Sequence, residues 1–366
     1  MTRKKHFKYA HLIWGDELKF STRLVELLCD PANELRGEDT LFVTPYSQVY
    51  DALKDKGNIE LVEYENKRDG RIVNYCGERA DWIFIHNICS PLEGLKIKKK
   101  YLGRIIWRTW GSDGKLYGDS GNAVKRIIKR AVGAMWRRRV RSFYDIGIAD
   151  TVDRLNMVER YGEVRTMHVA YAGRGNFDSL IDARNIKKDG DCLNVMIGHS
   201  GFSNDNHIGV MTSLERFSDR NMRIYMVLSY GEEDYIKKVR EYVDEKWSGK
   251  VVIIDKFMPY GEFASLLGQM DVAIFDGRAS YALGNIGMLL FLEKKIFLNP
   301  DGVIRRAFDL EDVPYALTDS IEKMTFDEFS APIEYKNANN NLAVKSYEEN
   351  IADWKAILAE LDLAEK

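Results

Sequence analysis

The sequence predicts an α/β protein made of two Rossmann-like, doubly wound domains that face a cleft. The 366 residues exceed the length that a single hydrophobic core usually serves. Apolar residues make up 45% and charged residues 30%, which is typical of a globular chain. Short apolar runs alternate with longer amphipathic stretches in both halves, and this rhythm is typical of parallel sheets with crossover helices.

The predicted strands are short runs rich in β-branched and aromatic residues. In the first half they are Tyr9–Ile13, Thr40–Thr44, Ile59–Glu63, Trp82–His86, Arg104–Trp107, Ile146–Ala149 and Thr166–Val169. In the second half they are Leu193–Ile197, Arg223–Leu228, Val251–Ile254, Val272–Phe275 and Ile296–Leu298. The helical period between strands predicts helices over Thr22–Cys29, Asn206–Phe217, Asp234–Glu245, Tyr260–Met270 and Asn285–Glu293.

A domain boundary is predicted where the composition shifts to Gly, Asp and Lys, over residues 171–190. This linker separates an N-terminal domain over residues 1–170 from a C-terminal domain over residues 191–345. Residues 346–366 are expected to form a last helix, because apolar residues recur there on one helical face.

Charge and cysteine content argue against several classes of protein. The 54 basic residues nearly balance the 56 acidic ones, so no nucleic-acid partner is expected. The 4 cysteines include no Cys-x-x-Cys pair and indicate reduced thiols in a cytoplasmic protein. No apolar run approaches the ~18 residues that a membrane-spanning helix needs.

The most informative motif follows the predicted strand Leu193–Ile197. Gly198, Ser200 and Gly201 form a glycine-containing turn that leads into a helix. Glycine allows a ligand to approach the backbone closely, and N–H groups at a helix N-terminus bind anions such as phosphate. The motif therefore indicates a phosphate site, and an ordinary strand-to-helix turn is the alternative.

A second strand-to-helix junction follows Val272–Phe275. Arg278 lies in this junction and would supply a positive charge to a diphosphate. Gly284, Asn285 and Ile286 open the helix that comes next. The alternative interpretation is a pair of packing glycines with a solvated arginine.

Further candidate side chains stand at the ends of other predicted strands. Tyr230 and Phe257 suit a wall for a nucleobase and ribose, or are core aromatics. Asp16, His86 and Asp113 are candidates for the base that takes the proton from an acceptor hydroxyl group. Helix caps and a satisfied half-buried histidine are the alternatives for these three residues.

Residues 124–141 form a basic segment that contains no acidic residue. Its apolar residues recur at helical spacing, so a stripe is expected to face the core while the cations remain available to anionic lipid headgroups. The cations expected at a membrane are Lys129, Arg130, Arg137, Arg138, Arg139 and Arg141. Nucleic acid is the rival partner, and a merely solvated helix is the third interpretation.

Three groups of residues together resemble glycosyltransferase family 56. They are Trp107-x-x-Trp110-Gly111-x-Asp113, Gly198-x-Ser200-Gly201 followed by His207-Ile208, and Phe257…Asp271…Ile286-Gly287. Members of this family move 4-acetamido-4,6-dideoxygalactose (Fuc4NAc) from TDP to lipid II in the synthesis of enterobacterial common antigen. The resemblance runs from about Leu12 to Asn299.

The resemblance implies a GT-B fold with an acceptor-side first domain, a nucleotide-sugar second domain and a last helix that returns to the first domain. It implies transfer from a nucleotide-diphosphate sugar donor, with dTDP expected, to a polyprenyl-diphosphate-linked glycan at the inner face of the cell membrane. We expect no metal ion or other cofactor. Asp113 then ranks first as the base, before His86 and Asp16, and Trp107 and Trp110 would stack on acceptor sugar rings.

The sequence departs from the family at two places where a donor sugar would lie. The family's Gly-Asn-Ser-Gly is Gly198-His199-Ser200-Gly201 here, and the approach to Gly284 is longer and different. The identity of the transferred sugar therefore stays open. A transferase that uses a UDP- or GDP-sugar on another bacterial glycan, and a non-catalytic nucleotide- or sugar-binding protein, are the alternatives.

Overall fold

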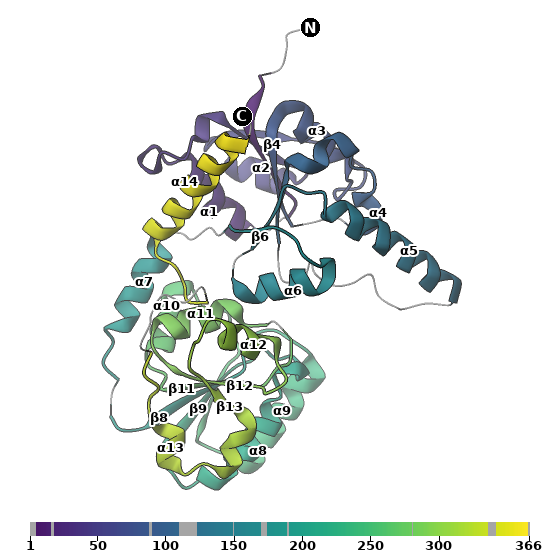
Figure 1. The fold of residues 1–366 in the computed structure, drawn as a ribbon. Coiled ribbons are helices and arrows are strands. Elements are labelled where there is room, and N and C mark those ends of the chain that lie inside the picture. The colour runs from purple at the N-terminus through teal and green to yellow at the C-terminus, as the bar shows by residue number, and fades with distance from the viewer. Residues whose placement is uncertain are drawn as a thin grey trace. The chain divides into compact units, whose positions relative to one another are not determined.

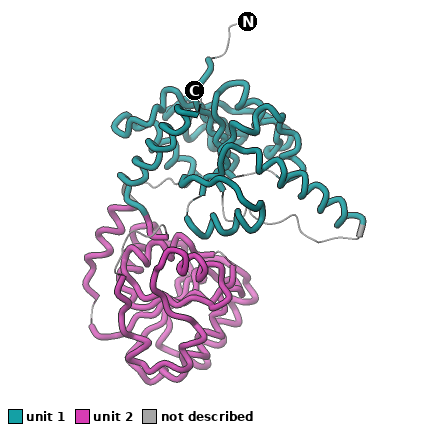
Figure 2. Tube along the Cα trace, in the orientation of Figure 1, with its two compact units in different colours: residues 1–173, 345–366 teal, residues 174–344 magenta. Residues whose placement is uncertain are grey.

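The computed structural model describes most of the chain. The described residues are 5–15, 18–87, 90–109, 123–148, 150–169, 174–188, 190–279, 281–335 and 342–364. The candidate residues Asp16, Trp110 and Asp113 lie outside these ranges. The chain divides into two compact units (Figure 2): residues 1–173 with 345–366 form unit 1, and residues 174–344 form unit 2.

Unit 1 contains a seven-stranded sheet in the order β3-β2-β1-β4-β5-β6-β7, in which every pairing is parallel. The strands are β1 Phe7–Ile13, β2 Thr40–Thr44, β3 Asn58–Leu61, β4 Ala80–His86, β5 Ile105–Arg108, β6 Asp145–Ile148 and β7 Thr166–His168. The α-helices are α1 Leu18–Cys29, α2 Ser47–Leu53, α3 Arg71–Arg79, α4 Pro91–Gly94, α5 Ala123–Val140, α6 Thr151–Tyr161 and α14 Tyr347–Ala364. Helices cover both faces of the sheet, and α5 extends away from the rest of the unit (Figure 1).

Unit 2 contains a six-stranded parallel sheet in the order β10-β9-β8-β11-β12-β13. The strands are β8 Leu193–Ile197, β9 Met222–Val227, β10 Val251–Ile254, β11 Val272–Phe275, β12 Lys295–Leu298 and β13 Ala316–Leu317. The α-helices are α7 Arg174–Arg184, α8 His207–Leu214, α9 Glu233–Lys246, α10 Tyr260–Gly268, α11 Leu283–Phe291, α12 Val303–Leu310 and α13 Phe326–Ser330. The prediction of two doubly wound α/β sheets is confirmed, and the two-residue β13 is the strand that the sequence did not indicate.

Both sheets are buried on both faces, which is the usual state of parallel strands between crossover helices. Strands β2, β5, β6 and β8 have no exposed residue, and their sequences are mostly apolar rather than alternating between apolar and polar residues. One face of the unit 1 sheet packs against the C-terminal helix α14. Its Trp354 is fully buried, with its ring centroid 5.5 Å from that of Phe84 on β4.

Helix α7 lies within residues 171–190, where the sequence indicated a linker. Its Leu180 and Ala183 are buried, and the ring of Phe177 lies 5.4 Å from that of Phe291 on α11. Close approach of α7 to α10 explains Gly268, where a Cβ atom would lie 2.4 Å from the carbonyl oxygen of Ala183. The sequence interpretation missed this helix, because the segment is rich in Gly, Asp and Lys although its apolar residues recur at helical spacing.

Candidate functional site

The strand order of unit 2 creates a ligand-binding edge. From β8 the chain continues to β9 and β10 on one side of the sheet, and β11 lies on the other side of β8. In such sheets ligands bind beyond the carboxyl ends of the strands, at the point where the strand order reverses. The loops after β8 and β11 therefore hold the candidate site, and both junctions identified in the sequence lie there.

The turn after β8 has no main-chain N–H group to offer a diphosphate. The N–H groups of His199 and Ser200 donate to Oδ2 of Asp205 at 3.0 and 2.9 Å. Those of Gly198 and Gly201 donate to the carbonyl oxygens of Ile274 and Tyr230. The anion-binding role expected for Gly198, Ser200 and Gly201 is therefore corrected, because their amides are already bonded within the protein.

The two glycines of the turn are required by packing. Gly198 has a φ of +66°, and a Cβ atom there would lie 2.6 Å from Nε2 of the buried His207. At Gly201 a Cβ atom would lie 2.4 Å from Cγ1 of Ile236. Ser200 is fully buried and donates its hydroxyl to Asp205 at 2.8 Å. These contacts show how the three residues shape the turn.

Asp205 holds the turn together from inside. Its carboxylate also lies 2.9 Å from Nδ1 of His199. Burial alone would raise the pKa of Asp205, but the hydrogen bonds and charge of its partners outweigh burial and lower it. Burial lowers the pKa of His207, beneath the turn, to about 4. An ionised carboxylate therefore stands next to a neutral imidazole under this edge of the sheet.

Aromatic side chains cluster on the open side of the turn. The His199 ring is stacked on Tyr281, with centroids 6.2 Å apart, and lies 6.5 Å from Tyr230. Tyr230 also contacts Phe202 edge to face. Exposed rings at a ligand-binding edge suit a flat ligand such as a nucleobase. Phe257, at the end of β10, is 81% exposed and is therefore no core residue.

Helix α11 begins beside this cluster. Ala282, which precedes it, has a φ of +62° and gives the helix no side-chain cap. A Cβ atom at Gly284 would meet no heavy atom of the described chain within 4 Å, and Asn285 is partly buried. Ile286 is 1% exposed, so the ligand contact expected for it is corrected to a core position.

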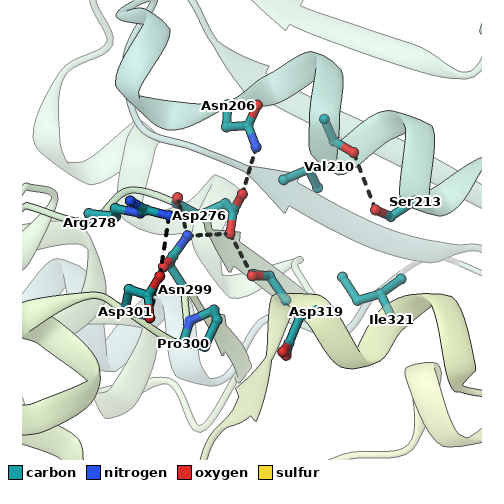
Figure 3. Close-up of a pocket in the computed structure, with 12 residues that line it drawn as sticks. Asn206, Val210, Ser213, Asp276, Arg278, Asn299, Pro300, Asp301, Asp319 and Ile321 are labelled. Carbon is teal, nitrogen blue, oxygen red and sulfur yellow. Dashed lines mark hydrogen bonds and ion pairs between the residues drawn. The ribbon is translucent and has the colours of Figure 1, made fainter.

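A polar cavity of about 260 Å³ lies at the carboxyl ends of β11, β12 and β13 (Figure 3). Asp276 is at its centre and accepts hydrogen bonds from the amide groups of Asn206 at 2.7 Å and Asn299 at 2.9 Å. Arg278, which also lines the cavity, is paired with Asp301 at 3.2 Å. The sequence indicated Arg278 but not the array of amide and carboxylate groups around it.

His86 lies at the carboxyl end of β4 in unit 1, as expected, but it is 4% exposed. Its Nε2 is 2.9 Å from Nδ1 of His11, whose ring is stacked on Phe84. Burial lowers the pKa of His11 to about 3, and burial with the neighbouring His11 and Arg108 lowers that of His86. Both imidazoles are therefore neutral, and the pair has the features of a buried structural contact.

A cluster that the sequence analysis missed lies at the next strand ends of unit 1. Arg108 ends β5, and its Nη1 lies 3.7 Å from Oδ2 of Asp153 on α6. Asp150 caps the N-terminus of α6 through the N–H of Asp153 at 2.9 Å. Burial, together with the Asp153 carboxylate, raises the pKa of Asp150 to about 6. Asp150 comes directly after a predicted strand, so the rule that selected Asp16 and Asp113 would have selected it as well.

Trp107 lies in the core of unit 1. Its side chain is fully buried in β5, and its ring lies 5.7 Å from that of Tyr161 and 6.4 Å from those of Trp136 and Phe143. The stacking role expected for this residue is therefore corrected to a core role.

The basic segment forms α5, but its apolar stripe faces solvent instead of the core. Val124, Ile127, Ile128 and Met135 are between 55% and 68% exposed. The C-terminal turn anchors the helix through Trp136 and Val140, which are buried. Arg139 donates to the carbonyl oxygen of Ile97, and Arg141 donates to that of Tyr161. These two arginines hold α5 in place and are therefore removed from the set available to a membrane.

Comparison with solved structures defines the fold. A glycosyltransferase from Rickettsia africae ESF-5 is 11% identical, covers 97% of this chain and 94% of its own, and has a TM-score of 0.55. HepE of Anabaena, in complex with UDP and glucose, is 12% identical, with coverages of 97% and 99% and a TM-score of 0.57. An α,α-trehalose 6-phosphate synthase from Burkholderia multivorans is 10% identical, with coverages of 99% and 97% and a TM-score of 0.57. The chain therefore has the GT-B fold.

The family follows from a match over most of the sequence. The family described as 4-alpha-L-fucosyltransferase, glycosyl transferase group 56, matches residues 55–362. The chain belongs to this family and is a glycosyltransferase. No curated protein sequence is significantly similar to it.

Proposed function

We propose that the protein transfers an (amino)deoxyhexose such as Fuc4NAc from a nucleotide diphosphate, with dTDP as the nucleotide, to a polyprenyl-diphosphate-linked glycan. The description of the family as a fucosyltransferase supports a deoxyhexose donor. The observation that carries the donor site is the switch point of unit 2, where exposed rings stand beside the N-terminus of α11.

The donor would use three features of this edge. The nucleobase would lie against Tyr230 and Tyr281, and the diphosphate over the open backbone at Gly284. The N-terminal N–H groups of α11 would stabilise the charge that develops on the departing diphosphate. Hydroxyl groups of the donor would pair with the carboxylates and amides around Asp276.

A panel of nucleoside diphosphates tests the donor site. A ligand that binds the folded state raises the unfolding free energy by about 2.7 kcal/mol at a hundred times its Kd. We expect dTDP to raise the melting temperature more than UDP or GDP, and dTDP-Fuc4NAc to be consumed when a lipid-linked glycan is supplied. A preference for UDP or GDP would change the assigned donor. No stabilisation by any of the three would overturn the donor site.

On the acceptor side we propose a carboxylate of unit 1 as the base. Asp113 and Asp16 are the carboxylates among the three sequence candidates, which also include His86. Asp150 joins them because its raised pKa suits proton transfer near neutral pH. A positioned base contributes about 10²–10⁴-fold in rate. The single variants Asp113→Asn, Asp16→Asn and Asp150→Asn should therefore reveal the base by a loss of that size with donor binding retained. Near-normal turnover in all three would overturn the assignment.

We also propose that α5 binds an anionic membrane surface at the inner face of the cell membrane. No helix of the described residues is long and apolar enough to cross a membrane. Helix α5 instead combines an exposed apolar stripe with cations and no acidic residue, which is the composition of an interfacial helix. Lys129, Arg130, Arg137 and Arg138 are the proposed cations, each contributing about 1 kcal/mol near an anionic surface.

Vesicle sedimentation tests the membrane surface with a matched control. Ile127→Asp should abolish binding to vesicles that contain anionic phosphatidylglycerol, because it places a charge in the stripe. Leu310→Asp changes a side chain of similar exposure on α12 of unit 2 and should leave binding intact. Equal binding by both variants would overturn the assignment to α5. The proposal includes transfer without a metal ion, so activity in EDTA should equal activity with Mg²⁺.

A further inference from the structure

His199 and Asp205 form a dyad at the candidate donor site. Nδ1 of His199 lies 2.9 Å from Oδ2 of Asp205, so the opposite ring nitrogen, Nε2, is turned away from the carboxylate. Neither ring nitrogen of His199 meets a described residue in hydrogen-bond geometry, whereas Asp205 is 4% exposed and bonded to the turn. A carboxylate close to Nδ1 favours the ring orientation in which Nδ1 faces it, and this orientation leaves Nε2 to meet a ligand.

The position of the ring restricts what Nε2 can meet. His199 is stacked on Tyr281, which stands two residues before Leu283, the first residue of α11. The N–H groups of the turn are bonded within the protein, so an anion at this place must be met by a side chain or by α11. An imidazole N–H that donates to an oxyanion forms a hydrogen bond strengthened by the charge of the oxyanion.

We propose that His199 is a donor-site residue whose Nε2 donates a hydrogen bond to a diphosphate oxygen of the nucleotide, with Asp205 as its positioning residue. This inference rests on the proposed nucleotide-diphosphate donor and adds a residue to that site. The sequence indicated Ser200 as the residue of this turn that contacts the ligand. The proposal assigns this contact to its neighbour His199. Ser200 points inward to Asp205, while the ring of His199 lies among the exposed tyrosines.

The titratable groups that face His199 come from several segments of unit 2. Asp205 lies on its own loop, His207 begins α8, Tyr230 follows β9, and Tyr281 precedes α11. Asp205 is ionised and His207 is neutral in the pH range of interest, because the pKa of each lies below that range. Asp205 and His207 therefore keep these charge states between pH 8 and pH 6.

The experiment compares wild type with His199→Asn, which keeps a polar group of similar size but cannot be charged. The Kd of the best-binding nucleoside diphosphate and of the corresponding nucleoside is measured by calorimetry at pH 6 and pH 8. We expect His199→Asn to weaken the diphosphate about tenfold at pH 6, since the lost hydrogen bond carries charge. The ratio of the wild-type Kd to the variant Kd is taken at each pH. Protonation of the ligand affects both Kd values equally and cancels in this ratio. The Kd of the nucleoside should be the same for wild type and variant.

His6→Asn is the matched control, because His6 also contacts an aspartate, Asp81 at 2.8 Å, but lies on unit 1. It should change neither Kd. In a double-mutant cycle, Asp205→Asn should add little to the effect of His199→Asn if Asp205 acts by positioning the ring. Should Asp205→Asn fail to fold, the affinity ratio of His199→Asn still decides the matter.

The outcomes separate the two proposals. If wild type binds the diphosphate and His199→Asn binds it equally well at pH 6, the role of His199 is overturned while the donor site stands. Equal weakening of the nucleoside and the diphosphate also overturns it, because the effect would then lie at the nucleobase. If wild type binds no nucleoside diphosphate, both proposals fail.

Discussion

The two units contain sheets with the same order of their first six strands, but the pKa values of the buried carboxylates at the carboxyl ends of the strands are shifted in opposite directions. Read from the first strand of each unit, β1 and β8, both sheets begin with the order 3-2-1-4-5-6. In unit 2 the buried carboxylate at the edge, Asp205, is saturated with donors and has a lowered pKa. In unit 1 the carboxylate at the edge, Asp150, is crowded by Asp153 and has a raised pKa.

The difference shows what each edge is suited to do. A carboxylate with a lowered pKa stays charged and rigid, and it leaves ligand contacts to the side chains around it. A carboxylate whose pKa approaches neutrality can exchange a proton, at the cost of holding a poorly solvated charge. This difference agrees with the proposed donor site in unit 2 and with the proposed base in unit 1.

The largest effect is expected from Trp107→Ala in unit 1. The indole is fully buried among three other aromatic rings, so its removal should lower the unfolding free energy by about 3–5 kcal/mol. Urea unfolding measures this loss, and Trp107→Phe should cost clearly less because it keeps a ring. A stable Trp107→Ala variant with weakened acceptor binding would restore the surface role that the sequence indicated.

The next effect concerns the turn of unit 2. Gly201→Val should lower the unfolding free energy by about 2–3 kcal/mol, because its side chain would enter the space of Ile236. Gly284→Ala is the control from the same edge and should raise stability by about 0.5–1 kcal/mol, since Gly284 lies in α11 with open space around it. If Gly284→Ala nevertheless weakens nucleotide binding, the backbone there is close to the ligand. Equal stability of the two variants would show that the turn tolerates a side chain.

Much of the fold was predictable because buried parallel strands have short, mostly apolar sequences. The runs that became β8 and β11 are bounded by polar turns, so their limits matched the observed ones. The burial of Trp107 could not be predicted, because β5 is buried on both faces and its sequence does not alternate between apolar and polar residues. Helix α7 was missed because its apolar residues are few and separated by charged ones.

The site was predictable in place but not in detail. Counting residues after a strand located Gly198 and Arg278 at the edge, since topology alone determines where a strand ends. Whether an N–H group of the turn is available depends on Asp205, which reaches back from the 3-10 helix Ser203–Asp205. Such a contact depends on side-chain orientation, and no spacing rule encodes it.

Asp150→Asn probes the edge of unit 1 with an effect that depends on pH. The pKa of Asp150 is raised from 3.8 to about 6, so the folded state binds this proton more tightly than the unfolded state. The stability of wild type is therefore lost as pH rises from about 4 through 6, and the asparagine variant avoids the loss. Above pH 6 the variant should be more stable by about 1–2 kcal/mol, and at pH 4 the difference should vanish.

Asparagine caps a helix as well as aspartate does, so the fold at α6 should be kept. Thermal unfolding between pH 4 and pH 8 measures the difference. A gain in stability together with a loss of turnover would mark Asp150 as a functional group whose charge is costly to the fold. A variant that is less stable than wild type at every pH would mean that Asp150 is chiefly a helix cap.

The smallest effect is expected at the cavity of unit 2, where Arg278 and Asp301 form an exposed pair. Their side chains are 75% and 67% exposed, and such pairs contribute little to stability because water and salt screen them. Asp301→Asn should change the unfolding free energy by no more than about 0.5 kcal/mol. It should nevertheless strengthen the binding of a nucleoside diphosphate about two- to fivefold at low salt, because Arg278 loses a competing carboxylate. Glu241→Gln removes the partner of Lys237 in a similarly exposed pair on α9 and should change neither quantity. Calorimetric titration at two salt concentrations tests the difference. Equal affinity of wild type and Asp301→Asn at both salt concentrations would show that Arg278 does not belong to the donor site.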